Sequence, residues 1–216
     1  MTRTDHRTLR TLLRRSTAGA AVLATAGLLT ATDDVDAGVR TKSAIIAAEA
    51  DRALDAFDRW EADRNPADYV RFVQSREAAA AMTARDLEVD PEALQAEWAD
   101  APIDKQQAVL AAMSQLGVPY RSIASEPGAG FDCSGLTIWA FAQAGREIPR
   151  TSRDQFRAAE EVDHSEAEPG DFVYYPGHIS MYLGLDTMVH SPNSGSHVEA
   201  TDIPTKRSVR FADPLG

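Results

Sequence analysis

The stretch FDCSGL, residues 131–136, contains the only cysteine of this 216-residue chain and begins a helical pattern that leads into strand-like segments. One cysteine cannot form an internal disulfide, so it is either a small buried hydrophobe or a thiol with a chemical use. Polar Asp132 and Ser134 flank it where a loop enters the predicted helix. The start of a helix favours negative charge, and therefore thiolate. We interpret Cys133 as a candidate nucleophile.

Two histidines follow in strand-like segments, His178 in GHISMYLG (177–184) and His190 in MVHSP (188–192). Alternation predicts that His178, Ser180 and Tyr182 share one strand face. A turn at 184–186 would pair the two strands and bring both imidazoles to one end of the sheet. A cysteine, a histidine base and a second group that orients the base form a catalytic triad. His164 and His197 receive no catalytic role.

A zinc site is the rival chemistry for these residues. Cysteine and histidine are the side chains that zinc prefers, but their spacing here fits no compact ligand motif. We therefore expect no metal and no cofactor. The four residues that such a site would use are Cys133, His178, His190 and His197.

The order of elements predicts an α+β fold. Residues 42–100 have helical periodicity, a break at Asn65-Pro66 and a helix start at Asp90-Pro91. Ala101–Asp104 is the expected boundary, with Asp104 capping a helix that ends at Gly117. A further helix ends near Gly145. Strands are then expected at 171–175, 178–183, 187–191 and 197–200, with 208–211 as a fifth candidate.

The first residues read as an export signal. Five arginines precede an apolar run over 18–31, which suits a signal peptide better than a membrane span. The pair Arg14-Arg15 permits twin-arginine export, with the general secretory route and an uncleaved anchor as alternatives. We predict a signal peptide at 1–37, a helical segment at 38–100 and a catalytic domain at 101–216. The expected location is secreted or cell envelope, without stable membrane insertion after cleavage.

The charge balance limits the class of partner. The chain has 22 basic and 33 acidic residues, a net charge of −11, and no basic cluster. Such a balance favours solubility and argues against a nucleic acid held by charge.

Several ordered motifs resemble the NlpC/P60 family of papain-like cysteine peptidases, from about Asp104 to Phe211. They are LGVPY (116–120), FDCSGL (131–136), IPRTS (148–152) with Gln155, EPGDFV (168–173), HISMYLG (178–184) and MVHSP (188–192). The resemblance implies helices packed on a small antiparallel sheet. It implies hydrolysis of peptidoglycan stem peptides, commonly between γ-linked D-glutamate and the diamino acid. The residues that it assigns are Cys133 as nucleophile, His178 as base, His190 as orienting group, and Tyr120, Asp132 and Ser134 at the substrate.

The chain departs from the family pattern in one loop. The family usually has an aromatic residue and two glycines after the tyrosine, where this chain has RSIA (121–124). Two alternatives stay open: an acyltransferase or amidase of the same fold, and a catalytically silent wall-binding or partner-binding protein. Helices 42–100 carry much aromatic surface, so we expect them to pack on the catalytic domain. They could border the cleft and inhibit, or dock a protein partner.

Overall fold

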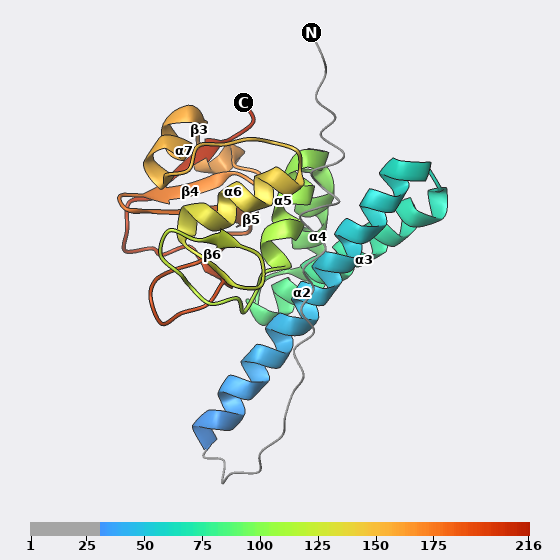
Figure 1. The fold of residues 1–216 in the computed structure, drawn as a ribbon, viewed down its shortest axis with the longest axis horizontal. Coiled ribbons are helices and arrows are strands. Elements are labelled where there is room, and N and C mark those ends of the chain that lie inside the picture. Colours follow the sequence, from blue (N-terminus) through green and yellow to red (C-terminus); the bar gives the residue numbers. More distant parts are fainter. Residues whose placement is uncertain (1–30) are drawn as a thin grey trace.

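The computed structural model describes residues 31–216 (Figure 1). The predicted signal peptide therefore lies outside the described residues, except for its last seven positions. The helices are α2 (Ala31–Asp63), α3 (Pro66–Asp86), α4 (Pro91–Asp100), α5 (Ile103–Met113), α6 (Cys133–Gln143), α7 (Ser152–Ala158) and the 3₁₀ turn η1 (His164–Glu166). The strands are β1 (Ser125–Glu126), β2 (Gly130–Phe131), β3 (Glu160–Val162), β4 (Phe172–Tyr175), β5 (His178–Gly184), β6 (Thr187–His190), β7 (Glu199–Asp202) and β8 (Arg210–Asp213).

Helices α2 and α3 form a hairpin that projects from the rest of the molecule (Figure 1). The predicted break is confirmed, because Asn65 caps α3 by accepting from the Ala67 N–H and Pro66 occupies the first turn. Proline lacks a backbone N–H, so it costs nothing at a position where that group has no helical partner. Four aromatic rings fill the hairpin in consecutive contacts 5.0–5.8 Å apart: Phe57, Trp60, Tyr69 and Phe72.

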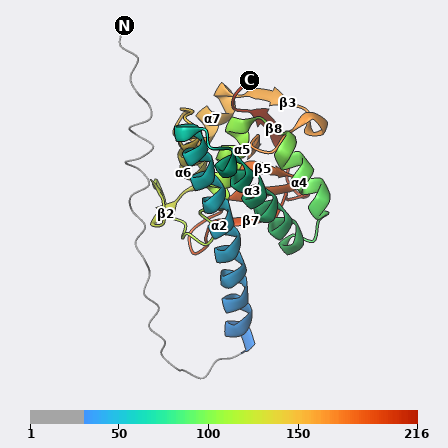
Figure 2. The same ribbon diagram turned by 90° about the vertical axis from the view of Figure 1, so that its right-hand side faces the viewer.

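The helical segment packs on the domain that follows, as predicted. Figure 2 shows α2 and α3 in front of α5, and α2 contacts α5 directly. Trp98 of α4 is buried, and its indole N–H donates to the Leu183 carbonyl at 2.7 Å. One hydrophobic core runs from Ile46 in α2 to Val198. The division into separate domains at residue 100 stays a prediction.

The Trp98 contact lies away from the candidate base. Trp98 donates to Leu183, whereas His178 begins β5, and the five residue steps between them span about 17 Å. Cleft covering by residues 42–100 stays a prediction. Among residues 31–216, no helix is both long and apolar enough to cross a membrane.

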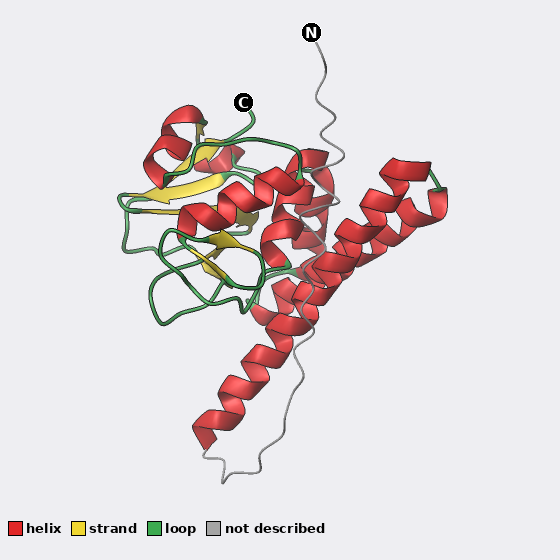
Figure 3. Ribbon diagram, viewed as in Figure 1, coloured by secondary structure: helices red, strands yellow, loops and turns green. Residues whose placement is uncertain are grey.

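The main sheet is antiparallel and has the strand order β3-β8-β4-β5-β6-β7. Figure 3 shows its strands in yellow beside the red helices. The predicted strands are confirmed, and their ends agree with the predicted ends to within two residues. Strand β3 and the small β1–β2 hairpin were not predicted. Helices α5 and α6 share a core with one face, where Phe141 meets Phe172 edge-on at 5.7 Å. A second cluster, including Val173, Met188 and Phe211, fills the other face.

The helix start expected at Asp104 is wrong. Helix α5 begins at Ile103 after Pro102, without a side-chain cap. Asp104 instead lies in the first turn and pairs with Arg146 at the end of α6. The helix ends at Met113, and the chain turns until Gly117, whose φ of +85° a side chain would disfavour.

A buried lysine ties α5 to the sheet. The Lys105 ammonium lies 2.7 Å from Asp171, 3.0 Å from Asp213 and 3.2 Å from Glu168. Gly170 has a φ of +102°, and a Cβ there would lie 2.7 Å from the Lys105 Cβ. This close approach explains the glycine in the EPGD motif.

Candidate active site

Cys133 is the first residue of α6, and a tight turn fixes its backbone. Asp132 caps the helix by accepting from the Gly135 N–H at 2.6 Å. The Asp132 N–H donates to the Ala124 carbonyl at 3.0 Å. A Cβ at Gly135 would overlap that carbonyl oxygen, so glycine is required there. The cap leaves the N–H groups at the helix start free to face the sulfur.

The thiol lies between the start of α6 and the start of β5. Burial raises the pKa of Cys133, and the Asp132 carboxylate raises it further. The backbone N–H groups of Ile179, Ser134 and Cys133 lower the pKa but do not reverse the shift. The helix start thus favours thiolate as expected, but the loss of solvent on burial is the larger effect and the net shift of the Cys133 pKa is upward.

The two predicted histidines meet as expected from the hairpin. The His178 Nε2 lies 2.9 Å from the His190 Nδ1, with the rings 5.0 Å apart and nearly perpendicular. Leu185 and Asp186 both have positive φ and close the β5–β6 turn, which aligns Met181 with Val189. Both imidazoles are buried, at 6% and 7% exposure.

Glu199, which was not predicted from the sequence, extends the contact of His178 and His190 into a row of three side chains. The Glu199 Oε1 lies 3.3 Å from the His190 Nε2, because β6 and β7 pair His190 with Glu199. The hydrogen bond from His190 lowers the pKa of Glu199. No motif marks this glutamate, and only the register of β7 against β6 reveals it.

This row of groups assigns the histidine tautomers. The Glu199 carboxylate can only accept, so the His190 Nε2 carries a proton and its Nδ1 is free to accept. The His178 Nε2 then donates to that Nδ1. The remaining His178 nitrogen, Nδ1, keeps a lone pair that can take a proton from a thiol.

His178 is neutral at physiological pH. Burial lowers its pKa to about 3, with further contributions from the charges of His190 and Arg207. A neutral imidazole is a base, and a neutral thiol becomes a nucleophile when it loses its proton. An imidazole within reach of the thiol can therefore activate the sulfur at the moment of attack.

Of the three residues expected at the substrate, Asp132 and Ser134 flank the candidate nucleophile, and Tyr120 lies thirteen residues before it in the chain. Asp132 forms an ion pair with Arg150 at 2.8 Å, and the Ser134 hydroxyl donates to Asp132 and accepts from Arg150. Tyr120 is held by its backbone, which bridges to Phe131 and donates to the Ser196 carbonyl. Arg150 was not predicted, although it belongs to the IPRTS motif.

The other histidines lie elsewhere. His164 stacks on Phe211 and pairs with Asp186, while His197 is exposed in an isolated bridge to Pro119. Among residues 31–216, no group of three or more histidine, cysteine, aspartate or glutamate side chains is arranged to hold a metal ion.

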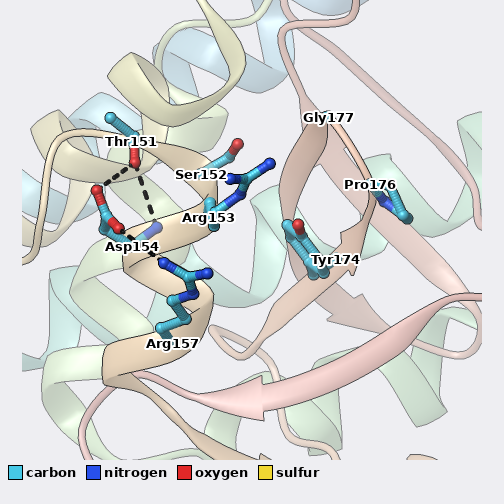
Figure 4. A pocket seen from close by; sticks show the side chains of 8 residues that line it. All are labelled: Thr151, Ser152, Arg153, Asp154, Arg157, Tyr174, Pro176 and Gly177. Atoms are coloured by element: carbon cyan, nitrogen blue, oxygen red, sulfur yellow. Dashed lines mark hydrogen bonds and ion pairs between the residues drawn. The ribbon is translucent and has the colours of Figure 1, made fainter.

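A polar cavity of about 430 Å³ adjoins the site between the start of α7 and the β4–β5 turn (Figure 4). Gly177, directly before His178, forms part of its wall. The other lining residues are Thr151, Ser152, Arg153, Asp154, Arg157, Tyr174 and Pro176.

The atypical loop at 121–124 packs on the helix start. Arg121 covers Gly130, and the Ala124 carbonyl accepts from Asp132. Ile123 is 86% exposed and has a φ of +58°, a conformation that β-branched residues rarely adopt.

Comparison with known proteins identifies the family of the chain. Residues 117–210 match the model of the NlpC/P60 family. A probable endopeptidase of Corynebacterium glutamicum is 37% identical over 147 residues, covering 65% of this chain and 69% of the relative. The bifunctional muramidase/DL-endopeptidase CwlT of Bacillus subtilis is 39% identical over 92 residues, or 39% of this chain and 28% of that one.

A solved structure, the P60 domain of an antigen of M. avium subspecies paratuberculosis, is 27% identical with a TM-score of 0.46. The match covers 52% of this chain and 96% of that domain. The matched region contains Cys133, His178, His190 and Glu199, and the relatives are named as endopeptidases. This chain belongs to the NlpC/P60 family of papain-like peptidoglycan endopeptidases.

Proposed function

We propose that the chain is an exported cysteine endopeptidase that cuts peptidoglycan stem peptides through Cys133, His178 and His190. The observation that carries the proposal is the 2.9 Å contact between His178 and His190, beside the helix start that bears the thiol. The substrate class is taken from the name of a relative, the peptidoglycan endopeptidase RipA of Mycolicibacterium smegmatis, which is 34% identical over 119 residues. The proposed bond joins γ-linked D-glutamate to the diamino acid.

Acylation begins with Cys133 and His178 both uncharged. The thiol proton moves to the His178 Nδ1 while the sulfur forms a bond to the scissile carbonyl carbon. The Cys133 backbone N–H donates to the resulting oxyanion. When the C–N bond breaks, His178 gives its proton to the departing amine, and a thioester to Cys133 remains.

Deacylation uses the same base. His178 takes a proton from water, whose oxygen attacks the thioester carbonyl. The C–S bond breaks, the sulfur recovers the proton from His178, and a free carboxylic acid leaves. His190, held by Glu199, keeps the His178 ring in the required tautomer throughout.

The substrate is proposed to lie against Tyr120, Asp132 and Ser134. Arg150 neutralises the Asp132 carboxylate and orders Ser134, so it fixes this side of the cleft. Export by a signal in residues 1–37 would place the enzyme in the cell envelope, where its substrate occurs. No nucleic acid and no cofactor enters this mechanism.

The test is digestion of purified muropeptides by the full chain, followed by mass spectrometry. Hydrolysis adds the mass of one water per bond cut, and the fragments identify the bond. Cys133→Ala and His178→Ala are expected to lose turnover. His190→Asn is expected to retain more than His190→Ala, because an amide oxygen still accepts the imidazole N–H.

The alternatives predict different products. An acyltransferase would give adducts of an added amine in place of free acid. A silent binding protein would retain muropeptides without any change of mass, and either result would overturn the proposal.

A further inference from the structure

An arginine without an acidic partner lies beside the candidate base. Arg207 lies in the connection between β7 and β8, where its backbone N–H donates to the Pro204 carbonyl. Its guanidinium carbon lies 4.7 Å from the centroid of the Tyr175 ring. Tyr175 in turn stacks on His178, with the rings 4.9 Å apart at 24°. The side chains therefore form a row from Arg207 through Tyr175 to His178.

Several other arginines in this half of the molecule form ion pairs, whereas Arg207, like Arg121 and Arg153, forms none that the structure describes. Arg150 pairs with Asp132, Arg157 with Asp154, and Arg210 with Glu161. Arg207 is exposed, and it makes no ion pair with any side chain that the structure describes. An unpaired cation is notable in a chain with eleven more acidic than basic residues.

The arrangement of the site indicates which half of a substrate would reach Arg207. In the proposed reaction His178 protonates the departing amine, so the departing half of the peptide must lie on the His178 side of Cys133. Tyr175 stacks on His178, and Arg207 lies on Tyr175. The ion pair of Asp132 and Arg150 lies instead at the start of α6, next to Cys133 in the chain.

We propose that Arg207, held on the ring of Tyr175, binds a free carboxylate in the departing half of the peptide substrate. A guanidinium presents a planar pair of N–H donors that match a carboxylate, and stacking on an aromatic ring holds that plane in place. The proposal rests on the proposed function, in which the departing half begins with a diamino acid. Its carboxylate can come from the end of the diamino acid side chain or from the end of the peptide.

The experiment compares three stem peptides that differ only in the departing half. One has both carboxylates free, one has the side-chain carboxylate amidated, and one has the C-terminal carboxylate amidated. With the full chain, kcat/KM is expected to fall about 10- to 100-fold for only one of the two amides, the one that removes the group bound by Arg207. That peptide identifies the source of the carboxylate.

The variants then assign the effect to Arg207. In Arg207→Ala, kcat/KM for the free acid is expected to fall by the same factor, whereas kcat/KM for the sensitive amide should barely change. Arg207→Lys is expected to retain part of the wild-type kcat/KM for the free acid. Lys206→Ala is the matched control, since it removes an equal charge from the adjacent exposed position. Equal losses on acid and amide for Arg207→Ala, or the same pattern for Lys206→Ala, would overturn the proposal.

A binding measurement separates this proposal from the proposed function. Calorimetry with Cys133→Ala measures the affinity for the isolated departing fragment, as acid and as amide, without any turnover. Preference for the acid that disappears in Cys133→Ala/Arg207→Ala supports the subsite even if the wild-type chain cleaves none of the peptides. Cleavage by the wild type without any such preference would refute the subsite and leave the endopeptidase function intact.

Discussion

Acidification is expected to weaken the fold through His178. Its pKa is about 3 in the folded chain, against 6.5 for an ordinary histidine. Between these values the unfolded chain binds one more proton than the folded chain. The free energy of unfolding therefore rises with pH in this window and falls as the solution is acidified from about 6.5 towards 3.

The size of the effect follows from the two pKa values. Each pH unit inside the window changes the unfolding free energy by about 1.4 kcal/mol. Between pH 7 and pH 4 the His178 contribution is a loss of about 3 kcal/mol, which is a large part of the stability of a typical domain. The cause is the cost of placing an imidazolium in the buried site next to His190 and Arg207.

Urea unfolding at steps of half a pH unit from pH 7 to pH 4 measures the free energy of unfolding of the wild type and of His178→Gln. The difference between the two profiles removes the contribution of carboxylates common to both. The isoelectric point of about 4.9 lies inside the window, so protein concentrations must be low. His197→Gln, which replaces an exposed histidine, is the matched control and is expected to follow the wild-type slope.

The opposite slope would refute this reasoning. If Cys133 and His178 exist as a thiolate–imidazolium pair in the free enzyme, the pKa of His178 lies above 6.5. The wild type would then gain stability relative to His178→Gln on acidification. Parallel profiles would show that His178 titrates alike in both states.

Three further outcomes are expected. Lys105→Met should lower the unfolding free energy by about 3–5 kcal/mol by leaving Asp171 charged and buried, and adding Asp171→Asn should restore part of it, as measured by urea unfolding; no recovery would contradict the ion-pair account. Glu199→Ala should lower kcat about 3- to 10-fold while Glu199→Gln retains most activity, since the amide oxygen still accepts from His190; full turnover in the alanine variant would exclude the orienting role. Ile123→Gly should raise the unfolding free energy by about 1 kcal/mol, because it relieves positive φ and loses little burial; a lower midpoint in urea would contradict it.

Local chemistry made much of the fold predictable from the sequence. The break at Asn65-Pro66 and the helix start at Asp90-Pro91 depend on hydrogen bonds within one turn, and both were found as predicted. The strands at β4 to β6 follow from alternation and short turns. The meeting of His178 with His190 follows from that hairpin, since antiparallel neighbours joined by a tight turn share a register.

Other elements could not be predicted because they depend on distant partners. Asp104 has the composition of a cap, but it lies within reach of Arg146, and the ion pair replaces the cap. Strand β3 pairs only with β8, fifty residues later in the chain, and its own residues carry no strand signal.

The order of amino acids is enough to identify the reacting groups: one cysteine at a helix start, then two histidines on adjacent strands. Their protonation and their partners depend on how the chain packs. Burial raises the pKa of Cys133 and lowers that of His178 because the charged forms lose solvent, a property of the packed environment. Glu199 reaches His190 through the pairing of β7 with β6, and Arg207 reaches Tyr175 across the β7–β8 connection, so neither contact is encoded in any local pattern.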